Sequence, residues 1–177
     1  QMRQYAQAAE LLERALGRLR RGGQDSTVSA STVQALARRC AEAYAKAEQP
    51  TRAAAVLRDH GMELEAAEQY CKAGEWDTGL ALFVRHQQFD RAAQLCEELG
   101  RAPELHTILG ERFLAEGREE DAAREFEAGE QWWRAGEMYQ RIGEHGKAAE
   151  MYARHGDEER AAEMYMAAGD PRRAAIA

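Results

Sequence analysis

Alanine recurs along this chain at an interval of 13 residues, and no other feature of the sequence restricts its fold as strongly. It stands at positions 53, 66 and 92, with Gly79 in its place between them, and the series resumes at 122, 135, 148, 161 and 174. A second alanine usually follows directly. We call the first residue of each unit position 0. Self-similarity at a fixed period is typical of proteins built from stacked repeats.

Two further positions of the unit are equally regular. Position +4 carries a large residue, with Cys96 as the small exception: Leu57, Tyr70, Phe83, Phe126, Tyr139, Tyr152 and Tyr165. Position +8 is usually glycine: Gly61, Gly74, Gly100, Gly143, Gly156 and Gly169. Gly129 arrives one residue early, and Gln87 replaces the glycine once. Offsets 0, +1 and +4 share one helix face, and glycine at +8 suits the left-handed residue that ends a helix.

Each unit therefore predicts a helix of about ten residues and a tight turn. Such a helix is marginal alone, so its stability has to come from its neighbours. Three prolines in the whole chain leave room for helices, and the sequence predicts an all-α fold. The expected helices are 2–21, 31–47, 51–60, 63–73, 76–86, 89–99, 103–116, 119–128, 131–142, 145–155, 158–168 and 172–177.

The interruption between the two series contains a recognisable motif. It reads His106-x2-Leu109-Gly110-x2-Phe113, then Gly117, then Ala122-x3-Phe126. This stretch, residues 106–126, resembles the tetratricopeptide repeat, although His106 stands where that pattern has Trp. Ala41-x2-Tyr44 followed by Ala53-x3-Leu57 is a weaker second match. Elsewhere two helices take 26 residues, a compact spacing that is similar to the helical repeats of vesicle-coat, soluble NSF-attachment and intraflagellar-transport proteins.

The resemblance implies a right-handed α-solenoid of stacked short antiparallel helix hairpins, with protein or peptide partners. We expect residues 1–177 to form a single α-solenoid. Incomplete units at both ends suggest a segment of a longer protein. A polar, glycine-led stretch predicts a flexible loop over residues 22–30, after which Ser31 or Thr32 is expected to cap the second helix.

Composition excludes several classes of function. A net charge of −7 argues against a general nucleic-acid binder, which needs a basic surface. Cys40, Cys71 and Cys96 form an odd set without metal-ligand spacing, so we expect free thiols in a reducing compartment. No apolar run approaches the length of a membrane span, and no secretory leader is evident. The sequence predicts a soluble, cytoplasmic protein that does not insert into membranes.

Catalytic, cofactor and metal sites are not predicted. The chain has no nucleophile elbow, phosphate-binding loop or dinucleotide fingerprint. Its five histidines lack metal-ligand spacing. Its carboxylates are spread along the helices rather than gathered, so an enzyme is the remote reading.

Trp133 is the best candidate for contact with a partner. At position −2 of its unit it lies about 160° from the alanine face, whereas Trp76 and Trp132, at position −3, belong to the core face. An exposed tryptophan is a reasonable binding hot spot, and folding over the adjacent turn is the equally weighted alternative. The Tyr and Met residues of the repeated Glu-Met-Tyr strings are interpreted as core, against a Met-rich binding groove.

A charge ladder accompanies Trp133. Pairs spaced three residues apart are expected on the helix surface: Arg134 with Glu137, Lys147 with Glu150, and Arg160 with Glu163. The predicted partner-binding residues are therefore Trp133, Arg134 and Glu137. A plain solvated face is the alternative. The function expected overall is a non-catalytic protein-interaction scaffold or adaptor. The alternative is a structural subunit that self-associates into a homo-oligomer through its solenoid ends.

Overall fold

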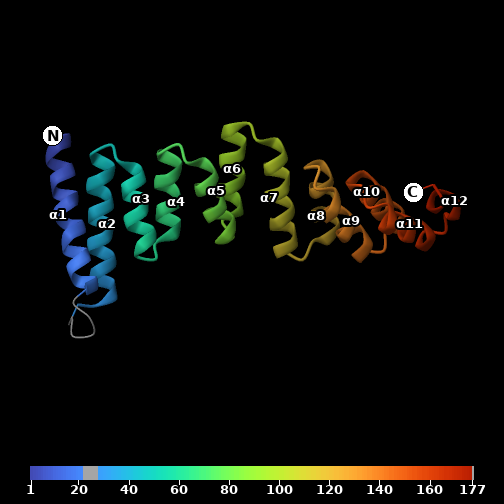
Figure 1. Ribbon diagram of the computed structural model, residues 1–177, viewed down its shortest axis with the longest axis horizontal. Helices are drawn as coiled ribbons and strands as arrows, with labels where there is room; N and C mark the ends of the chain where they lie inside the picture. The colour runs from blue at the N-terminus through green and yellow to red at the C-terminus, as the bar shows by residue number, and fades with distance from the viewer. Residues whose placement is uncertain (22–27, 177) are drawn as a thin grey trace. The chain divides into compact units, whose positions relative to one another are not determined.

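The computed structural model describes residues 1–21 and 28–176, and in these ranges the chain is helical without a strand. The helices are α1 (Met2–Arg21), α2 (Ala30–Lys46), α3 (Pro50–Asp59), α4 (Glu63–Lys72), α5 (Trp76–Arg85), α6 (Phe89–Leu99), α7 (Ala102–Ala115), α8 (Glu119–Ala128), α9 (Trp132–Arg141), α10 (His145–His155), α11 (Glu158–Ala167) and α12 (Pro171–Ala174). Figure 1 shows them in chain order. The predicted all-α class is confirmed, and most helices begin and end within a residue of the expected positions.

The helices group into two compact units. Unit 1 comprises residues 1–86, with helices α1 to α5, and unit 2 comprises residues 87–177, with helices α6 to α12. Inside each unit, every helix packs against the next one along the chain. The expectation of a single solenoid over residues 1–177 stays a prediction.

The turns explain the sharp reversal between successive helices. Position +8 of the 13-residue repeat has a positive φ in every repeat that includes this position, for example 84° at Gly143 and 90° at Gly156. The amide at +9 then donates to the carbonyl at +4, as Glu144 does to Tyr139 at 2.9 Å. This is the Schellman arrangement, in which a left-handed residue satisfies the last helical carbonyls. Residue +9 is also the N-cap of the following helix, so one short segment ends one helix and starts the next.

The turn after α8 differs from the sequence prediction, in which Gly129 was the glycine of position +8 arriving one residue early. The glycine at 129 has an ordinary φ of −85°, and Glu130 takes the left-handed conformation with a φ of 58°. Gly129 is needed for space instead, because a Cβ there would lie 3.0 Å from the Pro103 carbonyl oxygen and 3.1 Å from the His106 Cβ. The period of 13 therefore holds through residue 130, with glutamate at position +8.

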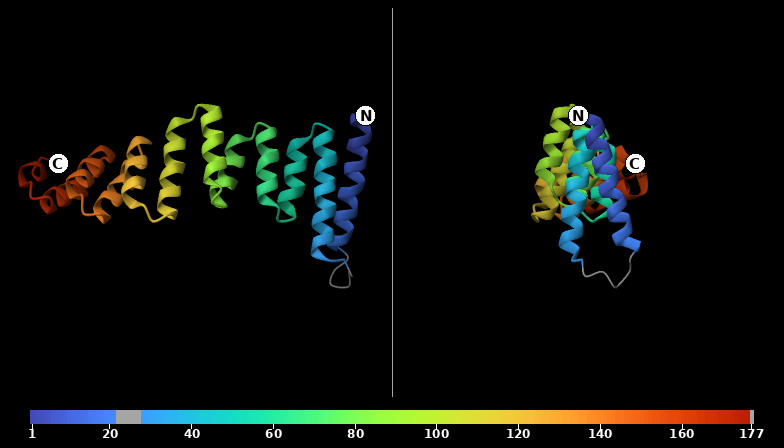
Figure 2. Two further views of the ribbon diagram at one scale, coloured as in Figure 1. Left: turned by 180° about the vertical axis from the view of Figure 1, so that it is seen from behind. Right: turned by 90° about the vertical axis from the view of Figure 1, so that its left-hand side faces the viewer.

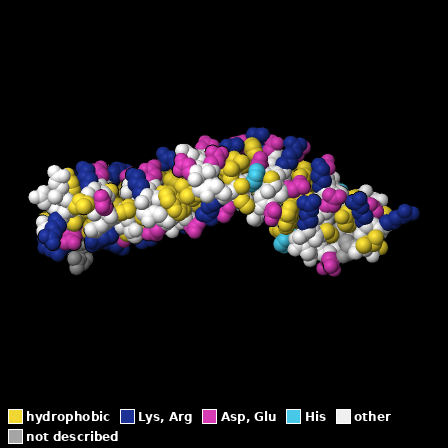
Figure 3. Space-filling view, turned by 90° about the horizontal axis from the view of Figure 1, so that it is seen from above, with side chains coloured by type: hydrophobic (Ala, Val, Ile, Leu, Met, Phe, Trp, Pro, Cys, Tyr) yellow, Lys and Arg dark blue, Asp and Glu magenta, His cyan; other side chains and the backbone are white. Residues whose placement is uncertain are grey.

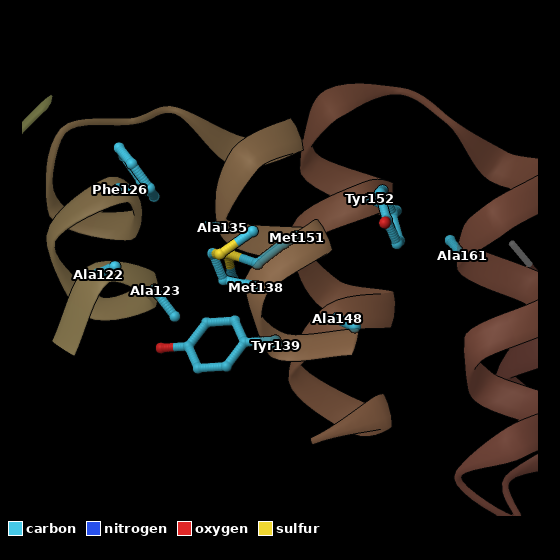
Figure 4. Close-up of a cluster of buried hydrophobic side chains, with 10 residues drawn as sticks. All are labelled: Ala122, Ala123, Phe126, Ala135, Met138, Tyr139, Ala148, Met151, Tyr152 and Ala161. Atoms are coloured by element: carbon cyan, nitrogen blue, oxygen red, sulfur yellow. The ribbon is translucent and has the colours of Figure 1, made fainter. Parts of the chain in front are cut away.

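Small residues and rings interlock between neighbouring helices of unit 2. A Cβ at Gly136 of α9 would stand 3.0 Å from the Tyr152 ring of α10, and one at Gly110 of α7 would stand 2.5 Å from the Phe126 ring of α8. Figure 4 shows the resulting cluster, with the Tyr139 ring directed toward Ala123 of α8. Phe126 and Tyr152 are fully buried. The interpretation of these repeated aromatics as core is confirmed here, and only Tyr165 is half-buried.

The hydroxyl groups of the buried tyrosines form hydrogen bonds at a constant spacing in the sequence. Tyr139 donates to Glu127 at 2.8 Å and Tyr152 donates to Gln140 at 2.9 Å, each to a residue 12 positions earlier. Burial first, and then the Glu127 carboxylate, raise the pKa of Tyr139 above its ordinary value. The neutral hydroxyl therefore remains a donor, and each hydrogen bond holds a helix in register with the preceding one.

The α1–α2 hairpin of unit 1 is built differently from the repeats. Its helices are 20 and 17 residues long, and Figure 2 shows them side by side in both views. The Tyr44 hydroxyl donates to Glu13, and the buried Cys40 thiol donates to the Ala9 carbonyl at 3.4 Å. Burial, helped by Glu13, raises the pKa of Cys40 to about 11, so this thiol stays protonated and unreactive.

The start of α2 departs from the prediction. Ser29 is its N-cap, and the Ser29 side chain accepts from the Thr32 amide at 3.2 Å. Neither Ser31 nor Thr32 is the cap, because both lie inside the helix, and Ala30 is helical rather than part of a loop. Residues 22–27 of the predicted flexible loop 22–30 lie outside the described residues.

Candidate interaction surfaces

A groove runs along α2 and α4 of unit 1 above α3. It has a volume of about 510 Å³, and Ala41, Ala45 and Leu57 supply its apolar lining. Charged side chains of both signs form the rim on each wall: Arg38, Glu42 and Lys46 on α2, and Glu65, Glu68 and Lys72 on α4. Because the two signs balance, the groove has no net charge, and its apolar floor is what distinguishes it from the surrounding surface.

Arg38 and Glu65 link the two walls of this groove. The Arg38 guanidinium donates to both carboxylate oxygens of Glu65, at 2.7 to 3.0 Å. This pair is bidentate, and α2 and α4 are thereby joined across α3. The Gln69 side-chain oxygen on the α4 wall is buried and accepts no hydrogen bond within the described part of the chain. A buried acceptor without a donor costs about 1–3 kcal/mol.

The matching position in unit 2 is closed. In α7–α8–α9, the motif Gly110-x2-Phe113 corresponds to Ala41-x2-Tyr44 of α2, and Phe126 corresponds to Leu57 of α3. The Phe126 ring occupies the space that Gly110 leaves. The Arg134 guanidinium then lies 4.0 Å from the centre of that ring and donates to Glu111 of α7 at 2.6 Å.

Arg134 is one of four cations that cover the repeated aromatic side chains of unit 2. Each stands at position −1 of its unit and lies over the ring eight residues earlier: Arg134 over Phe126, Lys147 over Tyr139, Arg160 over Tyr152 and Arg173 over Tyr165, at 4.0 to 5.8 Å from the ring centre. Cation–π contacts of this kind contribute about 0.5–1 kcal/mol at exposed sites. The sequence analysis missed this arrangement, although the 13-residue spacing of these four basic residues is the signal that could have revealed it.

The predicted charge ladder does not form as expected. Arg134 pairs with Glu111 and not with Glu137, Lys147 pairs with Glu144 at 3.5 Å, and Arg160 pairs with Asp157 at 3.7 Å. The reason is the direction of helical side chains, which lean toward the helix N-terminus. A long basic side chain in the first turn therefore meets the capping residue before it, or an acid on another helix. Glu137 remains exposed on α9.

Trp133 packs on neighbouring helices instead of standing clear of the surface. Its ring lies edge-on to Tyr152 of α10, with 5.4 Å between ring centres, and 5.5 Å from His155. The Arg160 guanidinium of α11 covers it at 4.1 Å. Trp133 is half-buried against the core of unit 2. The predicted role of Trp133, Arg134 and Glu137 in binding a partner stays a prediction, and Arg134 and Trp133 also hold helices together.

The other two tryptophans were both expected on the core face. Trp132 is half-buried against the core cluster, and the Arg154 guanidinium lies 5.0 Å from its ring. Trp76 is 40% exposed, so its assignment to the core is wrong. It is the first residue of α5.

The described residues contain no group of three metal-ligating side chains close enough to hold an ion. None of the three cysteines forms a disulfide. None of the helices in the described ranges combines the length and the apolar character that a bilayer crossing needs. Acidic and basic side chains are interspersed on the visible face in Figure 3. Neither a model of a known protein family nor a curated protein matches the sequence.

Proposed function

We propose that this chain is a non-catalytic protein-interaction scaffold of the tetratricopeptide-like class, a right-handed α-solenoid that binds a segment of a partner protein. The observation that carries the proposal is the groove above α3, whose floor is apolar and whose rim offers both signs of charge. The motif resemblance at residues 106–126 and the regular stacking of short helices support the same class. Cysteines that form no disulfide suit the reducing cytoplasm in which we place the protein.

The groove best suits an extended peptide with one apolar anchor side chain. The anchor would rest on Leu57 between Ala41 and Ala45, where burying apolar surface contributes about 25 cal/mol per Å². Lys46 and Lys72, the last residues of α2 and α4, would pair with acidic side chains that flank the anchor.

The test is a peptide-display selection on the full chain, followed by titration of the enriched peptides. Ala45→Trp fills the groove from its half-buried α2 wall, and Ala153→Trp places the same side chain on an exposed position of α10 as a matched control. We expect at least a tenfold loss of affinity with Ala45→Trp, which is about 1.4 kcal/mol, and no loss with the control. Enriched peptides that bind both variants equally, or a selection without enrichment, would contradict the proposal.

A further inference from the structure

A second groove lies on α11 and α12 of unit 2. Its volume is about 480 Å³, and Ala162, Met166 and Ala174 are among the residues that line it. The Met166 side chain is 60% exposed, which is unusual for a large apolar residue. Glu159 and Glu163 form an acidic rim one helical turn apart. The surface is therefore an apolar depression with negative charge along one side.

Helix α1 of unit 1 has an exposed flank with the opposite character. Ala9 and Leu16 are buried against α2. On a helical projection Leu11 points away from that contact, and it is 64% exposed. Arg14 and Arg18 stand on the same side and are both exposed. This flank is an apolar ridge with positive charge beside it.

The two surfaces are complementary in charge and in spacing. Glu159 and Glu163 are four residues apart, as are Arg14 and Arg18, and side chains at that spacing lie about 5–6 Å apart on a helix. None of these four side chains forms an ion pair with another residue in the described ranges. Leu11 supplies the protruding apolar group and the alanines of α11 and α12 leave space for it.

We propose that the α11–α12 groove of one molecule receives the exposed flank of α1 from a second copy of this chain. The contact joins two different surfaces, so it is heterologous and permits head-to-tail addition of further copies. The second copy is the occupant that the charges favour, because the same chain supplies both the acidic rim and the matching pair of arginines. The inference does not depend on the peptide groove above α3.

Sedimentation velocity of the full chain over a wide range of concentration tests the proposal. We expect the sedimentation coefficient of the unmodified chain to rise with concentration above that of a 19.8 kDa monomer. The variant Glu159→Arg/Glu163→Arg and the variant Arg14→Glu/Arg18→Glu should each lose this rise, because like charges then face each other. The four positions are exposed, and circular dichroism should confirm an unchanged helix content in both variants.

Mixing the two variants is the decisive step. The arginines introduced into the groove of the first then meet the glutamates introduced on α1 of the second, and the unmodified surfaces also match, so association should return in the mixture. Failure of the mixture to associate, or a monomer at every concentration of the unmodified chain, would overturn the proposal and leave the groove to a different helix. Association of the first variant alone would indicate a symmetric α1–α1 contact instead, and would equally overturn it.

Discussion

The triplet α2–α3–α4 of unit 1 and the triplet α7–α8–α9 of unit 2 are built on one pattern, but the first is open and the second is closed. In unit 2 the middle helix presents Phe126, and Arg134 of the third helix covers it. In unit 1 the middle helix presents Leu57, and Glu65 stands in the place of Arg134. Glu65 is drawn to Arg38 of α2, so the apolar floor beside Leu57 stays uncovered.

The difference shows that a few side chains decide whether a helix triplet is closed or carries a groove. A ring at position +4 fills the space left by Gly110, and a cation at position −1 seals it. An aliphatic residue and a carboxylate at the same positions leave a groove of about 510 Å³. The helices and turns need not change, because position +8 and the alanine face are retained in both triplets.

The largest expected effect comes from truncating the two middle-helix residues. Phe126→Ala should lower the free energy of unfolding by about 3–5 kcal/mol, because a fully buried ring, its contact with Gly110 and its cation are all lost. Leu57→Ala should cost about 2 kcal/mol, at the low end for leucine, since water can enter the open groove. Urea denaturation followed by circular dichroism measures both, and hydrogen exchange assigns each loss to its unit. An equal or greater loss at Leu57 would contradict the open-and-closed comparison.

An intermediate effect is expected at Gly110. Its Cβ would lie 2.5 Å from the buried Phe126 ring, so Gly110→Ala should cost about 1–3 kcal/mol by overpacking. Gly146→Ala is the matched control, because nothing lies within 4 Å of that Cβ, and it should gain about 0.5–1 kcal/mol in helix propensity. Adding Phe126→Leu to Gly110→Ala recreates the Ala41–Leu57 pair of unit 1 and should recover part of the loss in thermal denaturation. If Gly110→Ala were as favourable as the control, the interlocking of glycine and ring would be wrong.

The smallest effect concerns the turns that the two units share. Glu48 of unit 1 and Glu130 of unit 2 have φ values of 57° and 58°. A left-handed conformation costs a non-glycine residue about 1–2 kcal/mol, and glycine loses about 0.5–1 kcal/mol of that advantage to its unfolded-state entropy. Glu48→Gly and Glu130→Gly should therefore each stabilise the chain by up to about 1 kcal/mol, measured as a higher Tm.

Gly143 stands at position +8 of another 13-residue repeat, and its φ is 84°. Gly143→Ala should therefore lower the stability of the chain. Unchanged stability in all three variants would show that position +8 does not limit these turns.

Most of the fold could be predicted from residue spacing because the decisive interactions are local. Helix ends follow from which residue can adopt a positive φ, and the buried face follows from offsets 0, +1 and +4. Two of the predictions that rested on spacing failed. Gly129 is small to make room for Pro103 and His106 of another helix, and Trp76 is exposed although its offset places it near the core face.

The candidate surfaces were harder to predict. Trp133 was singled out from its offset alone, but its packing on Tyr152 and under Arg160 depends on residues that lie 19 and 27 positions further along the sequence. The groove above α3 was not predicted, because an alignment of the 13-residue repeats shows a leucine and a glutamate but not the space that they leave. The ion pairs were assigned to the wrong partners, since spacing alone does not reveal which way a side chain leans.

The sequence by itself determined that this chain is a series of short helices, where each one ends, and which residues face the neighbouring helix. These properties depend on backbone hydrogen bonds and dihedral angles within about nine consecutive residues, which the 13-residue period encodes directly. Only the tertiary structure decided which cation covers which ring, which walls close and which leave a groove. Those outcomes depend on the approach of side chains from different helices, where Leu in place of Phe and Glu in place of Arg distinguish the open triplet from the closed one without altering the period.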